Sequence, residues 1–160
     1  MSNDFSIIVP AAGRGLRMGK SLPKQYLDLD GSPILQLTLQ RLWQLKPRHL
    51  CLVVSKEDDN WSGLPAAADC IIANGGATRA DSVLAGLLAL KLPPEKMVLV
   101  HDSVRPLFRV EDVQRLIEEV GTSLHGGLLA TPVIDTLKLA GAGQTIASTV
   151  DRSELWQAQT

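Results

Sequence analysis

Short apolar runs alternate with longer amphipathic stretches along most of the chain. Continuous runs rich in Val, Ile and Leu are typical of strands that are covered on both faces. These runs occupy residues 5–10, 50–54, 70–73, 97–101 and 127–130. Apolar positions at helical spacing predict helices over residues 33–45, 77–90 and 110–120. The alternation predicts right-handed βαβ units around a mostly parallel sheet.

Local signals refine these elements. Ser32 stands where an N-cap is expected, and Pro33 occupies the first helical position of the first helix. The stretch 19–33 is polar and interrupted by Gly and Pro, which predicts a loop with little regular structure. In the second helix the residues expected to face the core are Val83, Leu84, Leu87, Leu88 and Leu90.

The pattern changes after Thr131. Two half-polar segments, 135–139 and 145–150, flank a Gly-rich turn and predict an antiparallel hairpin. The fold class predicted for the chain is therefore α/β, a three-layer Rossmann-like and mostly parallel sheet. An antiparallel β-arm is expected to protrude from it over residues 136–152.

The composition argues against several classes of protein. The 160 residues suit one domain, and with 4% aromatic residues its core must be aliphatic. Lys and Arg number 16 against 17 Asp and Glu, which argues against a general nucleic-acid binder or a polybasic membrane protein. Cys51 and Cys70 lie in apolar runs and are expected to be reduced packing residues. No apolar run approaches a membrane span and no leader is visible, so a cytoplasmic location is expected.

The loop after the first strand carries glycines and cations. A dinucleotide fingerprint fails because Met18 stands where its third glycine belongs, and a P-loop fails because Arg14 stands where its first glycine belongs. A Gly-rich turn can still present backbone N–H groups to an anion, with Arg17 and Lys24 adding positive charge. Ordinary solvated loop cations are the alternative.

Asp102 directly follows the apolar run 97–101. A carboxylate at a strand end near cations is suited to Mg²⁺, which takes one or two carboxylates together with substrate phosphates. The alternatives are a helix N-cap or a salt bridge to Arg105. His101 is expected to serve packing or hydrogen bonding and not to act as a base.

Five segments together resemble the 2-C-methyl-D-erythritol 4-phosphate cytidylyltransferases. Their order and spacing match through the whole chain, and PKQYL and HDSVRP are the more specific of them. The segments are IVPAAGRGLRM (8–18), PKQYL (23–27), RADSVLAG (79–86), VLVHDSVRP (98–106) and TVDR (149–152).

The resemblance implies roles for individual residues. It implies catalysis by Arg17 and Lys24, with Mg²⁺ or another divalent cation held by Asp102. The nucleotide-binding residues would be Ala11, Ala12, Gly13, Gly15, Gly76, Ala77, Ser82, Asp102 and Ser103. Arg105, Thr136 and Arg152 match positions that bind methylerythritol phosphate. The arm would reach across a homodimer, so that Thr136 and Arg152 serve the partner's site.

The chain also departs from the family. Ala77 stands where an acidic residue is frequent, and Ser103 replaces a usual alanine. The family continues past Thr160, so an incomplete domain is expected. CTP and a sugar-alcohol phosphate are the implied partners, in the bacterial cytoplasm, with no nucleic acid and no membrane. Two alternatives stay open: a pentitol-phosphate (ribitol-phosphate) cytidylyltransferase and a non-catalytic nucleotide-binding fragment.

Overall fold

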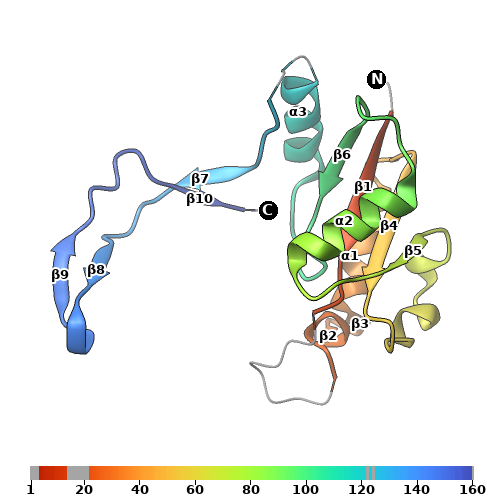
Figure 1. Ribbon diagram of the computed structural model, residues 1–160, viewed down its shortest axis with the longest axis horizontal. Coiled ribbons are helices and arrows are strands. Elements are labelled where there is room, and N and C mark those ends of the chain that lie inside the picture. Colours follow the sequence, from red (N-terminus) through yellow and green to blue (C-terminus); the bar gives the residue numbers. More distant parts are fainter. Residues whose placement is uncertain (1–3, 14–21, 122, 124, 160) are drawn as a thin grey trace. The chain divides into compact units, whose positions relative to one another are not determined.

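The computed structural model describes residues 4–13, 22–121, 123 and 125–159. These residues belong to two compact units, Met1–Arg115 and Leu116–Thr160 (Figure 1). The first unit contains the parallel sheet and one short antiparallel ladder, and the second contains the other two antiparallel ladders. The arm predicted over residues 136–152 therefore falls within the second unit, whereas the prediction of one incomplete domain stays a prediction.

The sheet of the first unit has the order β5-β4-β1-β6, and every described pairing in it is parallel. Its strands are β1 (Phe5–Pro10), β4 (His49–Val54), β5 (Ile71–Asn74) and β6 (Met97–Val100). In the register, Ile8 lies opposite Cys51 on one side and Val100 on the other. Four of the five predicted parallel strands are thus confirmed.

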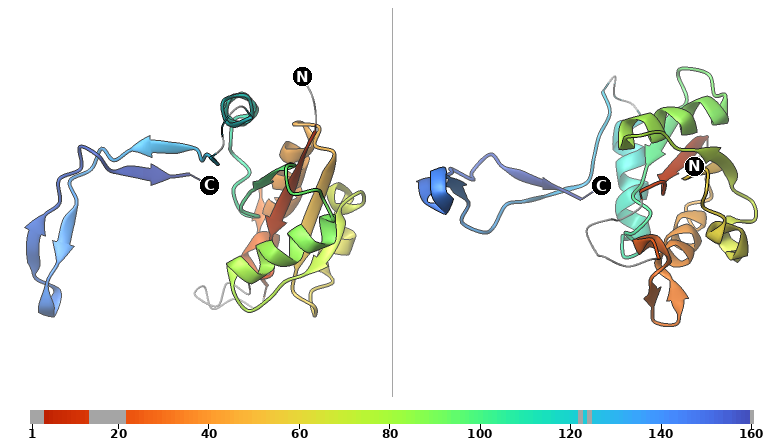
Figure 2. Two further views of the ribbon diagram at one scale, coloured as in Figure 1. Left: turned by 45° about the horizontal axis from the view of Figure 1, so that its top comes forward. Right: turned by 60° about the horizontal axis from the view of Figure 1, so that its bottom comes forward.

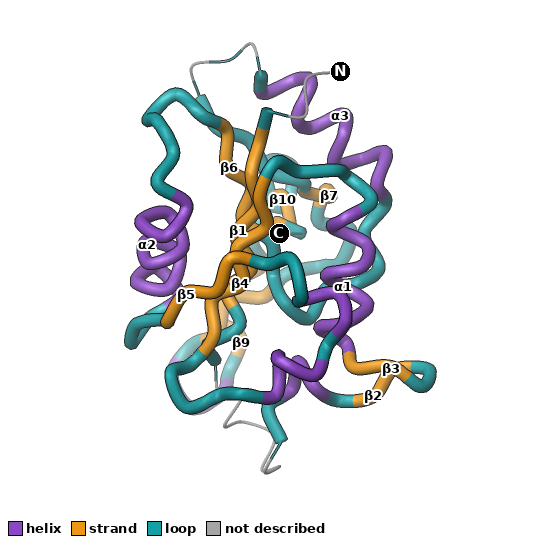
Figure 3. The backbone as a smooth tube through the Cα atoms, turned by 90° about the vertical axis from the view of Figure 1, so that its right-hand side faces the viewer, coloured by secondary structure: helices purple, strands orange, loops and turns teal. Residues whose placement is uncertain are grey.

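Helices cover both faces of this sheet. Figure 3 shows α2 (Arg79–Leu90) on one side and α1 (Ile34–Trp43) on the other, which confirms the three-layer prediction. Leu35, Leu39 and Leu42 of α1 are almost completely buried, as their spacing requires. The third helix, α3 (Val110–Val120), begins in the first unit and ends in the second.

The buried face of α2 differs from the prediction. Leu84, Leu87 and Leu88 are 55%, 42% and 68% exposed. Leu90 is buried as predicted, and beside it the helix turns Ser82 and Gly86 toward the sheet. A Cβ built on Gly86 would lie 2.8 Å from Ile8 Cγ2, so only a small residue permits this approach. Hydrophobicity at helical spacing therefore misidentified part of the buried face, because side-chain size decides which face can pack this closely.

The starts of the helices also differ from the prediction. α1 begins after Pro33, with no cap among the described side chains, while Ser32 and Pro33 form β3 (Ser32–Pro33) against β2 (Asp28–Leu29). α2 begins after Thr78, which forms a capping box with Asp81 through bonds of 3.0 and 3.1 Å.

Short 3₁₀ turns occupy several connections. They are η2 (Lys24–Tyr26), η3 (Asn60–Gly63), η4 (Pro65–Ala67) and η5 (Ala142–Gln144). With β2 and β3, η2 gives the segment 22–33 more regular structure than predicted. Cys51 and Cys70 are both free, as predicted, and burial raises the pKa of these thiols to about 11 and about 12.

The second unit contains two antiparallel ladders. β7 (Ala130–Pro132) pairs with β10 (Trp156–Ala158), and the chain between them forms the hairpin of β8 (Lys138–Ala140) and β9 (Ile146–Thr149) (Figure 2). The hairpin prediction is confirmed. The prediction of a fifth parallel strand at 127–130 is wrong, because a short apolar run indicates a strand without specifying its partner.

The close approach of α2 to the sheet predicts the effect of Gly86→Val. A Cβ at position 86 would lie 3.1 Å from Val53 Cγ2 and closer still to the Ile8 side chain, which leaves no room for a branched side chain. We expect the free energy of unfolding to fall by about 2 kcal/mol, the usual cost of overpacking a core. Urea denaturation would measure it. Gly63→Val is the control, since a Cβ at Gly63 meets nothing within 4 Å; equal losses in both variants would contradict the prediction.

Candidate nucleotide-binding site

A cavity of about 460 Å³ lies where β1, β5 and β6 end. In parallel sheets this edge collects the loops that follow neighbouring strands, and ligands bind there. All of its described lining residues belong to the first unit. Its described lining residues are Pro10, Ala11, Ala12, Gly13, Lys24, Gln25, Gly76, Ala77, Thr78, Arg79, Ser82, Asp102, Ser103 and Val104.

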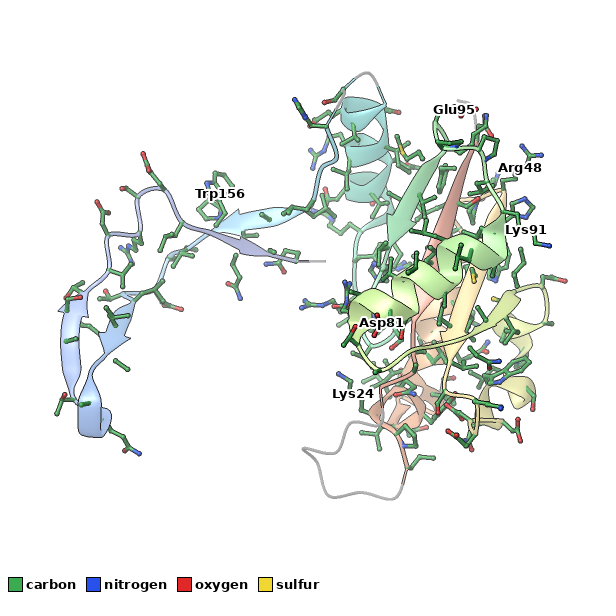
Figure 4. The ribbon with its side chains drawn as sticks, in the orientation of Figure 1. Lys24, Arg48, Asp81, Lys91, Glu95 and Trp156 are labelled. Atoms are coloured by element: carbon green, nitrogen blue, oxygen red, sulfur yellow. The ribbon has the colours of Figure 1, made fainter. Side chains whose placement is uncertain are left out.

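Most of the predicted nucleotide site comes together in this cavity. The predicted residues that line it are Ala11, Ala12, Gly13, Lys24, Gly76, Ala77, Ser82, Asp102 and Ser103. Figure 4 shows Lys24 below the N-terminal end of α2, on which Asp81 lies. Gly15 and Arg17 lie outside the described residues. Arg105 contacts Asp102 without being among the described lining residues, whereas Thr136 and Arg152 lie exposed in the second unit.

Backbone hydrogen bonds between the strand ends fix the shape of the cavity. Ala11 N donates to Val53 O at 2.7 Å, and Gly75 N donates to Val54 O at 2.8 Å. A Cβ on Gly75 would lie 2.4 Å from Ala12 Cβ, so the absence of a side chain at Gly75 lets the loop after β5 approach the loop after β1. A Cβ built on Gly13 would meet none of the described residues within 4 Å.

Asp102 is held by two arginines. Arg79 Nη2 lies 3.0 Å from Oδ1 and Arg105 Nε lies 3.1 Å from Oδ2. Burial alone would raise the pKa of the Asp102 carboxyl, but the hydrogen bonds and charges of Arg79 and Arg105 outweigh it, and the pKa is lowered. The predicted alternative of a salt bridge to Arg105 is therefore observed in this structure.

The same carboxylate also suits a metal. Among the described residues no three His, Cys, Asp or Glu side chains form a metal-binding group. Mg²⁺ needs no such group, because it takes one or two carboxylates beside phosphate oxygens and water. Asp102 offers a hard oxygen donor at the cavity wall, so the donor set fits Mg²⁺ bound together with a nucleotide.

His101 packs beneath the site, as predicted. Its side chain is 6% exposed, its Nε2 donates to Arg105 O at 2.9 Å, and its ring meets Phe108 edge-on at 4.7 Å. Burial lowers the pKa of His101, and the Arg105 hydrogen bond and the Asp102 charge offset this only in part. His101 therefore supports the Asp102–Arg105 loop as a neutral side chain near pH 7.

Three residues near the site were not predicted. Arg79 pairs with Asp102 from 23 positions away, and Thr38 Oγ1 in α1 donates to Ser103 O at 3.0 Å. Gln25 is buried against the first loop. Gln25 and Arg79 had a signal in the sequence, since they lie in the PKQYL and RADSVLAG segments, but no spacing rule assigned either of them a contact.

The strand order, the two-sided helix layers and the cavity at the strand ends define a nucleotide-binding α/β protein of the nucleotidyltransferase type. Residues 5–160 match the family described as IspD: 2-C-methyl-D-erythritol 4-phosphate cytidylyltransferase, and the chain belongs to this family.

Relatives with that name support the assignment. The one from Ectopseudomonas mendocina is 46% identical over 100% of this chain and 71% of its own length, and the one from Vibrio vulnificus (strain YJ016) is 46% identical over 96% and 67%. A solved 4-diphosphocytidyl-2C-methyl-D-erythritol synthase is 38% identical with a TM-score of 0.82, covering 100% of this chain and 73% of that one. The cytidylyltransferase from Thermus thermophilus is 30% identical with a TM-score of 0.76, covering 97% and 67%.

Within the described part of the chain, no helix combines the length and the apolar character that crossing a membrane requires.

The lowered pKa of His101 predicts a pH dependence of stability. The ordinary pKa of histidine is 6.5, and the pKa of His101 in the folded chain is lower. At pH values between the two, the unfolded chain therefore binds the proton more tightly than the folded chain does. In metal-free buffer the free energy of unfolding should thus fall as the pH drops from 7 to 5. Urea denaturation at each pH should show a smaller fall in the free energy of unfolding for His101→Gln over this range. Replacement of the exposed His125 by Gln is the control; a fall in His101→Gln as large as in the wild type would contradict the prediction.

Proposed function

We propose that this chain transfers CMP from CTP to 2-C-methyl-D-erythritol 4-phosphate, in non-mevalonate isoprenoid biosynthesis. The products are 4-diphosphocytidyl-2-C-methyl-D-erythritol and pyrophosphate. Membership of the family supports the reaction. The observation that carries the proposal is the cavity itself, which Gly13, Lys24 and Asp102 line together.

The reaction needs charge stabilisation more than a base. A phosphate oxygen of the sugar alcohol attacks the α-phosphorus of CTP, a new P–O bond forms, and the bond to the bridging oxygen breaks to release pyrophosphate. The attacking phosphate is already an anion, so positioning and electrostatic stabilisation supply most of the catalysis. We assign the stabilisation to Lys24 and Arg17. The backbone of Ala11–Gly13 and the Gly76, Ala77 and Ser82 segment would hold the nucleotide.

Asp102 is the proposed ligand for a divalent cation. When bound, Mg²⁺ would neutralise part of the phosphate charge. Arg79 and Arg105 hold the carboxylate ionised and oriented in this structure. We further propose that Arg105 contacts the sugar phosphate. Bacterial relatives support a location in the bacterial cytoplasm, which stays a prediction.

The arm is proposed to complete a partner's site in a homodimer. Thr136 and Arg152 flank the β8–β9 hairpin, and both are exposed. Because both residues match family positions for the sugar phosphate, on an arm that in the family reaches across a homodimer, the proposal assigns them to the sugar-phosphate subsite of a second copy of the chain.

Pyrophosphate release in the presence of CTP, Mg²⁺ and methylerythritol phosphate tests the reaction. We expect release with methylerythritol phosphate and far slower release with ribitol 5-phosphate. The Lys24→Ala variant checks that the measured turnover comes from this site: its kcat should be at least about 100-fold lower than that of the wild type. Its Tm should stay unchanged, because Lys24 is exposed.

Each other result selects a different function. Faster release with ribitol phosphate would identify a pentitol-phosphate cytidylyltransferase. CTP binding without release would identify a non-catalytic nucleotide-binding chain. A Lys24→Ala variant with normal kcat would remove Lys24 from the mechanism.

Mixed dimers test the arm. Arg17→Ala and Arg152→Ala chains, each inactive alone, would be co-expressed with different tags and the heterodimer purified. If Arg152 serves the partner, one of the two sites in the heterodimer is intact and about half of the wild-type kcat returns. If Arg152 serves its own chain, both sites carry one defect and no activity returns, which would refute the proposal.

A further inference from the structure

Lys24 lies on a short turn that is closed by few hydrogen bonds of its own. η2 spans three residues, and two backbone bonds close it, from Tyr26 N to Pro23 O at 3.0 Å and from Leu27 N to Lys24 O at 3.2 Å. No side chain among the described residues caps it. Short 3₁₀ turns have poor hydrogen-bond geometry, so contacts outside the turn must set the position of the Lys24 backbone.

Gln25 supplies such a contact on the cavity side. Its side chain is 2% exposed, and Nε2 donates to Ala11 O at 2.8 Å. Ala11 is itself fixed to the sheet through Val53 O. The bond therefore joins the two ends of the segment between Ala11 and Lys24, and both of those residues line the cavity.

Tyr26 anchors the opposite side of the turn. It is 7% exposed, and its hydroxyl donates to Asp58 Oδ2 at 2.7 Å. Burial and the hydrogen bond to Asp58 raise the pKa of Tyr26 well above its usual range, so the hydroxyl keeps its proton. Loss of the Gln25 bond would leave this second anchor in place, and the turn can still form.

We propose that Gln25 is a positioning residue, which fixes the Lys24 ammonium relative to the Ala11–Gly13 backbone. This inference rests on the proposed function, in which both groups contact the phosphates of CTP. A shift of about 1 Å in such a group can cost about 100-fold in rate. Gln25 lines the cavity, but it is 2% exposed and its Nε2 is bonded to Ala11 O, so we assign it an effect through Lys24 and not a contact with the substrate.

The chain offers a matched control in Gln36. This residue is also a buried glutamine, 8% exposed, and its Oε1 accepts a hydrogen bond from Ala66 N at 3.1 Å. Gln36 lies in α1 and outside the described set of cavity-lining residues. Gln→Met at either position keeps the side-chain length and removes one side-chain hydrogen bond, which is buried at Gln25 and part-buried at Gln36.

The experiment compares Gln25→Met with Gln36→Met by pyrophosphate release and urea denaturation. We expect similar losses of stability in the two variants. We expect kcat to fall about 10- to 100-fold in Gln25→Met alone, with a smaller change in KM for CTP. In the Lys24→Ala background, Gln25→Met should cause no further loss, since its effect passes through Lys24.

The outcomes separate this inference from the proposed function. Equal kcat in the two Met variants, or full additivity with Lys24→Ala, overturns the positioning role and leaves the function standing. If the wild-type chain binds CTP without turnover, the Kd for CTP from calorimetry replaces kcat: weakening in Gln25→Met alone supports the inference, and no weakening overturns it. A wild-type chain that binds no CTP overturns both.

Discussion

The site depends on the central position of β1 in the parallel sheet. Ile7, Ile8 and Val9 have no exposed surface, and the strand is hydrogen-bonded to β4 on one edge and β6 on the other. Because the paired strands run the same way, the ends of β1, β5 and β6 reach one edge of the sheet. The loops after β5 and β6, which begin about 65 and 90 residues beyond the loop after β1, thereby enclose one cavity with it. A change in the register of β1 would separate these loops.

Local charge, and not net charge, makes this cavity suitable for phosphates. The chain carries a net charge of −1. At the cavity, however, Asp102 is paired with Arg79 and Arg105, and Lys24 adds another cation. A bare carboxylate would repel a triphosphate, whereas a carboxylate between two guanidinium groups leaves this group of side chains with excess positive charge. The fixed bonds to both arginines also keep the carboxylate oriented before any ligand arrives.

The sequence was informative wherever one physical cause dominated. Strands buried on both faces require continuous apolar runs, so four strands and the loops after them were predictable, and with them most of the cavity lining. The α2 face was not, because Gly86 packs there by being small while Leu84 and Leu88 stay exposed. The Arg79–Asp102 pair and the Gln25–Ala11 bond join distant positions through the tertiary fold. No periodicity reports such contacts.

The exposure of the hairpin in the second unit favours the proposed dimer. Every residue of β8 and β9 is exposed, and Leu139 and Ile146 are 56% and 67% exposed. An isolated two-stranded hairpin is at best marginally stable in water, since it has no face to bury. The bulge at Leu139–Ala140 and the hydrogen bond from Lys138 to Thr149 shape the hairpin without covering it. A partner that covers the apolar side chains would supply the missing burial. The same contact would hold Thr136 and Arg152 in one geometry, so stability of the arm and completion of a site would have one physical origin.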